Sequence, residues 1–290
     1  MIEEVAPAKI NLFLHVGPRR ADGLHDLASL FVFSEEGDAV SAAPAEKLSL
    51  EIKGPFAPAL AAFALETNLV WRAAEALKAA ATIETGAALV LDKRLPVAAG
   101  IGGGSADAAA ALRALIRLWD VEISDEALAD IAFGLGADVP ACLAQSPVYV
   151  RGAGEIVEQG PALPPLWITL VNPGVETPTG PIFRDFDSAN PSPSAPALER
   201  ESAFRDGAAL AAYLARTRND LEPFAMLREH LIVASRDYLA ECDGCLITRM
   251  SGSGATVFAL FDAKEAAEHA ARGAEARGWW AMATRLASHG

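Results

Sequence analysis

The glycine-rich stretch at residues 96–106 constrains the fold of this chain more than any other segment does. It reads Pro-Val-Ala-Ala-Gly-Ile-Gly-Gly-Gly-Ser-Ala, and it stands between an apolar segment, 87–91, and a run of good helix formers without Gly or Pro, 105–119. Glycines let backbone N–H groups approach phosphate oxygens, and the start of a helix attracts an anion. The hydroxyl of Ser105 can also bind a phosphate. This order of strand, loop and helix predicts a phosphate-binding loop in a protein of mixed α and β structure.

Other interpretations of these glycines can be weighed against the sequence. A structural turn with close packing remains an alternative. A Walker A loop requires Gly-Lys-Ser/Thr, and no lysine follows the glycines. A dinucleotide-binding fingerprint requires an acidic residue at the end of a second strand, whereas Asp120 ends the predicted helix. The His-Arg-Asp and Asp-Phe-Gly signatures of protein kinases are missing. An NAD-dependent oxidoreductase is therefore kept only as a secondary alternative.

Composition limits the partners and the compartment. The chain has 290 residues and a formal net charge of −14, so it should repel phosphate backbones and anionic membranes, and we expect neither a nucleic-acid nor a membrane partner. The acidic N-terminus lacks the pattern of a signal peptide, and no apolar run is long enough to span a membrane. Three cysteines argue for a reducing compartment, and we expect a cytoplasmic protein, as a monomer or weak homodimer.

Periodicity and turn residues predict the other elements and a division into two domains. We expect residues 1–155 to form an N-terminal ATP-binding and catalytic domain and residues 156–290 a C-terminal domain. A proline-rich surface loop is expected at 187–196. The predicted strands are 6–16, 27–33, 48–52, 87–91, 246–249, 256–261 and 279–286. The predicted helices are 68–81 with Thr67 as its cap, 105–119, one from about 124 that ends at Gly134 and Gly136, 207–214, 221–239 and 263–277.

Three separated segments resemble the motifs of the GHMP kinases, a family named for galactokinase and for homoserine, mevalonate and phosphomevalonate kinases. They are Pro-Ala-Lys-Ile-Asn-Leu at 7–12, the glycine-rich loop at 96–106, and Ser-Gly-Ser-Gly-Ala-Thr-Val-Phe at 251–258. The resemblance implies an ATP-dependent kinase with an alcohol as phosphoryl acceptor and Mg²⁺ as companion of ATP. It also implies an α+β two-domain fold, with an N-terminal domain like ribosomal protein S5 domain 2 and a ferredoxin-like C-terminal domain.

Further segments, at 20–25, 136–140, 177–179 and 219–222, resemble one branch of this family. Members of that branch phosphorylate a hydroxyl of 4-diphosphocytidyl-2-C-methyl-D-erythritol, giving its 2-phosphate, in non-mevalonate isoprenoid biosynthesis. A kinase of another small alcohol, of the homoserine or mevalonate type, is an alternative, and a non-catalytic nucleotide-binding regulator is another. The branch often has Tyr where this chain has Leu24, so base stacking from that side is not expected here.

The resemblance assigns roles that the residues alone leave open. By itself Asp138 could cap a helix ahead of Pro140, Lys9 could be a solvated charge on a strand, and His25 could be a loop residue without a duty. Cys242 and Cys245 resemble half of a zinc or redox site, but three cysteines cannot complete a Cys₄ site. The metal ligands remain unknown. The implied roles are catalysis by Lys9 and Asp138; ATP binding by Pro96, Val97, Ala98, Ala99, Gly100, Ile101, Gly102, Gly103, Gly104, Ser105 and Ala106; substrate binding by Asn11, His25, Thr179 and Phe183; and support of the phosphate loop by Gly252, Ser253 and Gly254.

Overall fold

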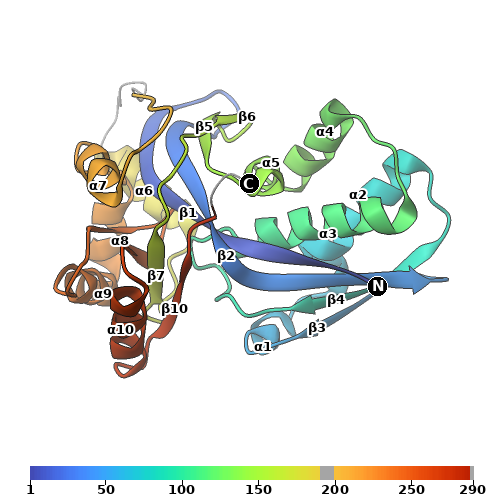
Figure 1. Cartoon of the computed structure of the whole chain (residues 1–290). Coiled ribbons are helices and arrows are strands. Elements are labelled where there is room, and N and C mark those ends of the chain that lie inside the picture. The colour runs from blue at the N-terminus through green and yellow to red at the C-terminus, as the bar shows by residue number, and fades with distance from the viewer. Residues whose placement is uncertain (190–198, 288–290) are drawn as a thin grey trace. The chain divides into compact units, whose positions relative to one another are not determined.

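The computed structural model describes residues 1–189 and 199–287, and these form two compact units (Figure 1). Unit 1 comprises Met1–Ala8, Glu36–Val97 and Gly102–Ala144, and unit 2 comprises Lys9–Glu35, Ala98–Ile101 and Gln145–Gly290. The units do not divide the chain at one position, because strands β1 (Ile2–Arg19) and β2 (His25–Ala45) contribute residues to both. The domain boundary that we expect after residue 155 therefore stays a prediction.

Unit 1 is a sheet covered by helices. Strand β4 (Gly86–Asp92) pairs antiparallel with the second half of β2 and parallel with β3 (Ser49–Lys53). Helices α2 (Leu69–Ala81) and α3 (Gly103–Trp119) pack against each other and lie on one face of this sheet (Figure 1). Helix α3 buries six alanines, and such small side chains permit close helix packing. The unit also contains α1 (Ala57–Leu60), η1 (Leu65–Thr67), α4 (Asp125–Leu135) and α5 (Val139–Ala144).

Unit 2 contains two antiparallel arrangements. The first half of β2 pairs with β5 (Val148–Gly152), which forms a hairpin with β6 (Ile156–Gln159). A separate four-stranded sheet has the order β10-β7-β9-β8, and its members are β7 (Trp167–Asn172), β8 (Ile247–Met250), β9 (Val257–Phe261) and β10 (Trp280–Arg285). Every residue of β9 is buried, as expected for an inner strand.

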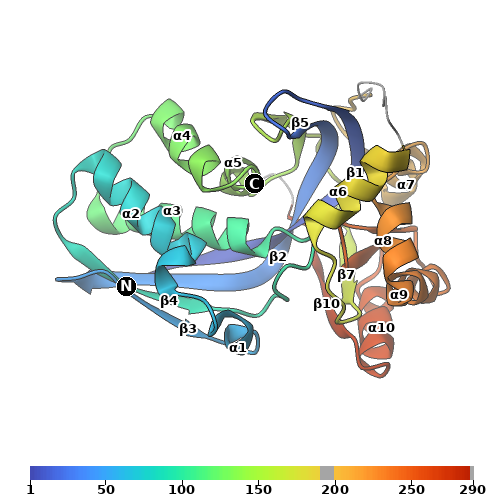
Figure 2. The same cartoon turned by 180° about the vertical axis from the view of Figure 1, so that it is seen from behind.

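Helices complete the core of unit 2. Helix α10 (Lys264–Glu275) lies along β7 and β10 (Figure 2), and it turns four alanines toward the sheet side. The apolar cluster of this unit also takes residues from α6 (Thr179–Ala189), α8 (Glu222–Arg228) and α9 (His230–Ala240). Helix α7 (Gly207–Leu214) begins with Asp206 as its cap, whose carboxylate accepts from Ala209 N at 2.8 Å. Within the described residues, no helix combines the length and apolarity needed to cross a membrane.

Most of the predicted elements are confirmed, and three differ. The predicted helix at 221–239 is two helices, α8 and α9, because the backbone at Glu229 is extended, with φ −131° and ψ 96°. Asn68, not Thr67, caps α2, since its side chain accepts a hydrogen bond from Val70 N at 2.8 Å. The predicted loop at 187–196 begins inside α6, which ends at Ala189, and the rest of that loop lies outside the described residues.

Candidate active site

The glycine-rich loop joins β4 to α3 as the sequence predicts. The backbone is left-handed at Ala98, Gly100 and Gly102, with φ of 53°, 75° and 61°, and α3 begins at Gly103. The first N–H groups of a helix have no partner within the helix, so they are free to bind an anion. Residues 96, 97 and 102–106 of the loop belong to unit 1, and residues 98–101 belong to unit 2.

A buried charged group, which we call the Lys93 network, ties the two ends of the loop in unit 1. Its members are Lys93, Asp38 and Asp107. The Nζ atom of Lys93 lies 2.5 Å from Asp38 Oδ2 and 2.6 Å from Asp107 Oδ2. Asp38 Oδ1 accepts hydrogen bonds from the backbone N–H groups of Arg94 and Leu95, just before the loop. Asp107 stands in the second turn of α3, just after the loop.

Burial dominates the titration of this network. Burial, with a smaller contribution from Asp38, raises the pKa of the Asp107 carboxyl to about 7 against the lowering effect of the Lys93 charge. Burial by itself would lower the pKa of Lys93, but the two carboxylates raise it overall. Asp107 Oδ1 is buried and accepts no hydrogen bond within the described residues. The network therefore holds together the segments on either side of the glycine-rich loop. The desolvation of its buried charges opposes folding.

The serine-glycine segment at 251–254 packs directly on Gly100 in unit 2. The Ser251 hydroxyl donates to Gly100 O at 2.9 Å and accepts from Asn11 N at 3.0 Å. A Cβ atom added at Gly100 would lie 2.5 Å from the carbonyl oxygens of Ser251 and Gly254, and one added at Gly252 would lie 2.9 Å from Gly100 O. Glycine is needed at these positions because two backbone segments touch there.

Lys9 and Asn11 lie in the part of β1 that belongs to unit 2. The Lys9 side chain is buried, with 4% exposure, so the alternative of a solvated surface charge is wrong. Its Nζ donates to Asn11 Oδ1 at 2.9 Å and stands 4.3 Å from the centroid of the Phe31 ring. The Asn11 amide in turn donates to Ser29 Oγ at 2.9 Å. Unit 2 therefore brings Lys9, Asn11 and Ser251 into one hydrogen-bonded chain that reaches Gly100.

Asp138 lies in unit 1, directly before α5. Its carbonyl oxygen accepts from Cys142 N at 3.1 Å, so it stands where a helix cap stands. Its side chain is partly exposed. The structure is compatible with both the capping role and the catalytic role, and the catalytic role stays a prediction.

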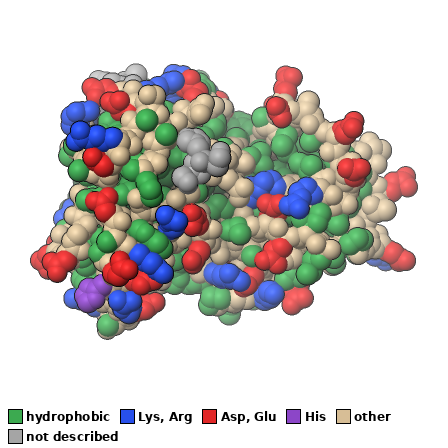
Figure 3. All heavy atoms as spheres, viewed as in Figure 1, with side chains coloured by type: hydrophobic (Ala, Val, Ile, Leu, Met, Phe, Trp, Pro, Cys, Tyr) green, Lys and Arg blue, Asp and Glu red, His purple; other side chains and the backbone are tan. Residues whose placement is uncertain are grey.

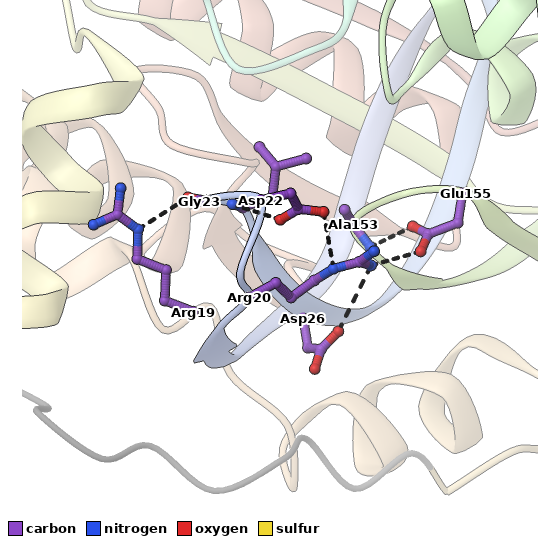
Figure 4. Close-up of polar contacts among 8 residues, drawn as sticks. Arg19, Arg20, Asp22, Gly23, Asp26, Ala153 and Glu155 are labelled. Atoms are coloured by element: carbon purple, nitrogen blue, oxygen red, sulfur yellow. Dashed lines mark hydrogen bonds and ion pairs between the residues drawn. The ribbon is translucent and has the colours of Figure 1, made fainter.

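The turn between β1 and β2, which presents Leu24 and His25, is held by Arg20 (Figure 4). Arg20 lies 2.6 Å from Glu155 Oε1, 3.2 Å from Asp22 Oδ2 and 3.9 Å from Asp26 Oδ1. Partial burial would raise the pKa of Glu155, but the hydrogen bonds from Arg20 and from backbone N–H groups lower it overall. The backbone closes the same turn, because Arg20 N donates to Leu24 O at 2.6 Å.

His25 and Phe183, which are far apart in the sequence, meet in unit 2. Their ring centroids are 5.1 Å apart, with planes tilted by 31°, and the Phe186 ring meets His25 edge-on at 6.1 Å. Leu24 is 49% exposed next to them. His25 Nδ1 lies 3.0 Å from Gly17 O, and its Nε2 lies 3.2 Å from Asp187 Oδ1. The two residues expected to bind a base are thus neighbours.

The first residue of α6, Thr179, reaches the serine-glycine segment. Its hydroxyl lies 2.9 Å from the Ser253 hydroxyl, so one expected substrate contact and one expected support of the loop are hydrogen-bonded to each other. Ser251, Asp187 and the Lys93 network are not among the residues to which the sequence assigns a role. Only Ser251 gave a signal, since it belongs to a quoted motif; the others depend on contacts between distant segments.

The cysteines, the possible metal ligands and the surface charges add three further observations. All three cysteines are free, and burial raises the pKa of Cys245 to about 11, so a reactive thiolate is disfavoured there. No group of three or more His, Cys, Asp or Glu side chains within residues 1–189 and 199–287 is placed to hold a metal ion. On the face drawn in Figure 3, Lys and Arg side chains are interspersed with Asp and Glu side chains.

Family models match both halves of the chain. The GHMP kinases N terminal domain matches residues 68–146, and GHMP kinases C terminal matches residues 194–278. The chain belongs to the GHMP kinase family, and it is an ATP-dependent kinase with the two-domain fold of that family. The resemblance noted in the sequence is confirmed. The two matched ranges lie on either side of residue 155.

Individual relatives narrow the comparison. A protein of Hyphomonas neptunium named 4-diphosphocytidyl-2-C-methyl-D-erythritol kinase is 50% identical over 287 residues, which cover 97% of this chain and 95% of the relative. A protein of the same name from Cereibacter sphaeroides is 50% identical over 289 residues, with 99% of both chains covered. The crystal structure of a 4-(cytidine 5'-diphospho)-2C-methyl-D-erythritol kinase has a TM-score of 0.78 at 33% identity, with full coverage of both chains. A homoserine kinase from Cytophaga hutchinsonii, with a TM-score of 0.71 at 19% identity and 99% and 94% coverage, shares the fold.

Proposed function

We propose that this enzyme transfers the γ-phosphoryl group of ATP to a hydroxyl of 4-diphosphocytidyl-2-C-methyl-D-erythritol, giving the 2-phosphate, in non-mevalonate isoprenoid biosynthesis. The observation that carries the proposal is 50% identity, over nearly the whole chain, with relatives named for that activity. The neighbouring rings of His25 and Phe183, whose planes are tilted by 31°, support it, because aromatic rings offer apolar faces on which a planar base can pack.

The proposed mechanism is direct, in-line transfer, which depends mainly on positioning and on charge neutralisation. The N–H groups of the glycine-rich loop and the start of α3 would bind the phosphates of ATP, and residues 252–254 would support that loop through their contact with Gly100. Asp138 would accept the proton of the attacking hydroxyl. Lys9 would supply positive charge to the transferring phosphoryl group.

The substrate contacts follow from the same assignment. His25 would donate a hydrogen bond to the cytosine base, and Phe183 would cover one face of it. Asn11 and Thr179 would bind the rest of the substrate, and both are already ordered by hydrogen bonds, to Ser29 and to Ser253. Ordered side chains lose little conformational entropy on binding, which favours affinity.

We propose Mg²⁺ as the companion of ATP. Magnesium prefers oxygen ligands and usually keeps several waters, so phosphate oxygens and waters can complete most of its coordination. The loop, whose donors are backbone N–H groups and a hydroxyl, fits a nucleotide that brings its own ion. When bound, the ion would neutralise charge on the phosphates.

We also propose a cytoplasmic enzyme that acts as a monomer or weak homodimer, without nucleic-acid or membrane partners. Three free cysteines suit a reducing compartment. The net charge of −14 opposes association with anionic polymers and surfaces.

The test of the function is kcat/KM, measured by coupled nucleotide consumption, for four alcohols. These are the cytidylylated substrate, free methylerythritol, homoserine and mevalonate. We expect the cytidylylated substrate to be preferred over free methylerythritol by at least about 100-fold, since a site built for a hydrogen-bonding base rejects a ligand that lacks it. If any of the other three alcohols equals or exceeds it, the proposed substrate is wrong and only the family assignment survives.

A further inference from the structure

The Asn-Asp-Leu-Glu motif at 219–222 runs beside β1 in unit 2, between α7 and the start of α8. The resemblance to the family assigns no catalytic or binding role to this motif. Leu14 N donates to Arg218 O at 3.0 Å, and Asp220 N donates to Leu14 O at 2.8 Å. These two hydrogen bonds fix the backbone on both sides of Asn219 against β1.

The side chain of Asn219 is buried, with 2% exposure, and it holds two carbonyl groups. Its amide nitrogen donates to Met250 O and to Gly252 O, both at 2.8 Å. Its amide oxygen accepts from Leu221 N at 3.0 Å. Both N–H donors of the amide are therefore used, and the two carbonyl groups that they bind lie on either side of Ser251.

The segment that Asn219 holds is the one that packs on the glycine-rich loop. The Ser251 hydroxyl donates to Gly100 O at 2.9 Å and accepts from Asn11 N at 3.0 Å. A Cβ atom added at Gly252 would lie 2.9 Å from Gly100 O, so the two backbones touch there. Because the contact is close-packed, the serine-glycine segment cannot shift far without moving Gly100.

We propose that Asn219 is a positioning residue for ATP binding, which acts by holding the serine-glycine segment against Gly100. The proposal rests on the proposed role of the glycine-rich loop in binding ATP, and it does not depend on which alcohol is phosphorylated. The substrate side of the site should be affected little. The Asn11 side chain has its own partners, since it accepts from Lys9 Nζ and donates to Ser29 Oγ, both at 2.9 Å.

The experiment compares Asn219→Ala with the wild type, each as the full chain and at a temperature where circular dichroism shows it to be folded. The readouts are Kd for a non-hydrolysable ATP analogue by calorimetric titration, and kcat with KM for ATP and for the cytidylylated alcohol. We expect Kd and KM for ATP to rise at least about 10-fold, while KM for the alcohol changes less than about threefold. A variant that is only less stable has fewer folded molecules, which lowers kcat and leaves both KM values unchanged.

Two further variants control for stability and for the turn at Leu221. Thr169→Val removes another buried donor of unit 2, which binds Ala267 O at 2.8 Å; this variant should lower Tm and keep Kd within about twofold. Asn219→Asp keeps an acceptor for Leu221 N but turns an oxygen toward the two carbonyl groups, so it should weaken binding at least as much as Asn219→Ala. Where Asn219→Ala does not fold, Asn219→Ser takes its place, because a hydroxyl can accept from Leu221 N and has one proton for two carbonyl groups.

A double-mutant cycle tests whether Asn219 acts through the serine-glycine segment. Ser251→Ala removes the hydroxyl that binds Gly100 O, and it should by itself raise Kd for the ATP analogue. If both residues act on Gly100 through one segment, their effects are not independent. We expect Asn219→Ala/Ser251→Ala to bind the analogue no more than about threefold more weakly than the weaker of the two single variants.

Three results would each overturn the role of Asn219. They are a folded Asn219→Ala protein with Kd within about twofold of the wild type, an Asn219→Asp protein with the wild-type Kd, and a double variant whose loss is the product of the two single losses. A wild type that does not phosphorylate the cytidylylated alcohol overturns the proposed substrate, but the titrations with the ATP analogue still decide the role of Asn219. A folded Gly100→Ala protein with the wild-type Kd overturns the proposed role of the loop in binding ATP, and this inference with it.

Discussion

Replacement of Lys93 by Met tests whether the Lys93 network holds the glycine-rich loop in place. The substitution keeps the length of the side chain and removes the positive charge that lies 2.5 and 2.6 Å from the carboxylates of Asp38 and Asp107. All three side chains are at most 4% exposed, so neither carboxylate can turn to water. Removing one partner of a buried ion pair typically costs about 3–5 kcal/mol. We expect a loss of that size at pH 8, or a fall in Tm of about 10 °C.

The pH dependence of the loss follows from Asp107. Its pKa in the folded protein is raised to about 7, so between pH 4 and 7 the folded state holds a proton that the unfolded chain has released. The stability contributed by this proton is present at low pH and is lost as pH rises through 7. Without Lys93 the pKa of Asp107 should rise further, so the variant continues to lose stability above pH 7. The difference between wild type and variant should widen by about 1 kcal/mol from pH 5.5 to pH 8.

Thermal unfolding followed by circular dichroism at pH 5.5 and pH 8 measures both effects. Lys47→Met, at an exposed lysine of the same unit, is the control and should change stability by no more than about 0.5 kcal/mol. Lys93→Met/Asp107→Asn should recover part of the loss, because one buried carboxylate is then neutral. A Lys93→Met protein that melts within about 3 °C of the wild type at pH 8 would refute the reasoning, as would a difference that narrows with rising pH.

Three further predictions concern the site. Asp138→Asn should lower kcat by about 10²–10⁴-fold with KM for ATP nearly unchanged, and steady-state kinetics that retain a tenth of wild-type kcat contradict its role as base. Gly100→Ala should lower Tm and weaken binding of a non-hydrolysable ATP analogue at least about 10-fold, because its Cβ would meet backbone oxygens at 2.5 Å. The control is Gly134→Ala, in open space on a helix, which should leave Tm unchanged or raise it. The double substitution of Cys242 and Cys245 by Ser should leave kcat/KM unchanged, and elemental analysis that finds one zinc per chain in the wild type would overturn this expectation.

Local elements were predictable because their causes are local. The loop before α3 is indicated by its glycines, and α3 follows from a run of helix formers without a breaker. The break between α8 and α9 was missed, since residues 221–239 keep apolar residues at helical spacing through Glu229. The capping of α2 was misplaced by one residue because Thr67 and Asn68 are both good caps.

Motifs indicated the family and the expected site residues. They did not indicate how these residues are arranged in space. The motifs placed Lys9, Asn11 and the serine-glycine segment in one family pattern. That Ser251 joins Asn11 to Gly100 is a contact across the sequence, which periodicity cannot report. The same holds for His25 and Asp187, whose pairing depends on how α6 packs within unit 2.

The sequence alone therefore determined the glycine-rich loop between a strand and a helix, most helices and strands, and the class of chemistry, because each is encoded by neighbouring residues or by a short motif. Only the tertiary structure decided which charges are buried and which partners they have. Nothing in the sequence distinguishes Lys93 or Asp38 from other lysines and aspartates, and only folding places both out of water. Burial makes the difference, since the same charges are weakly coupled in water and strongly coupled once water is excluded.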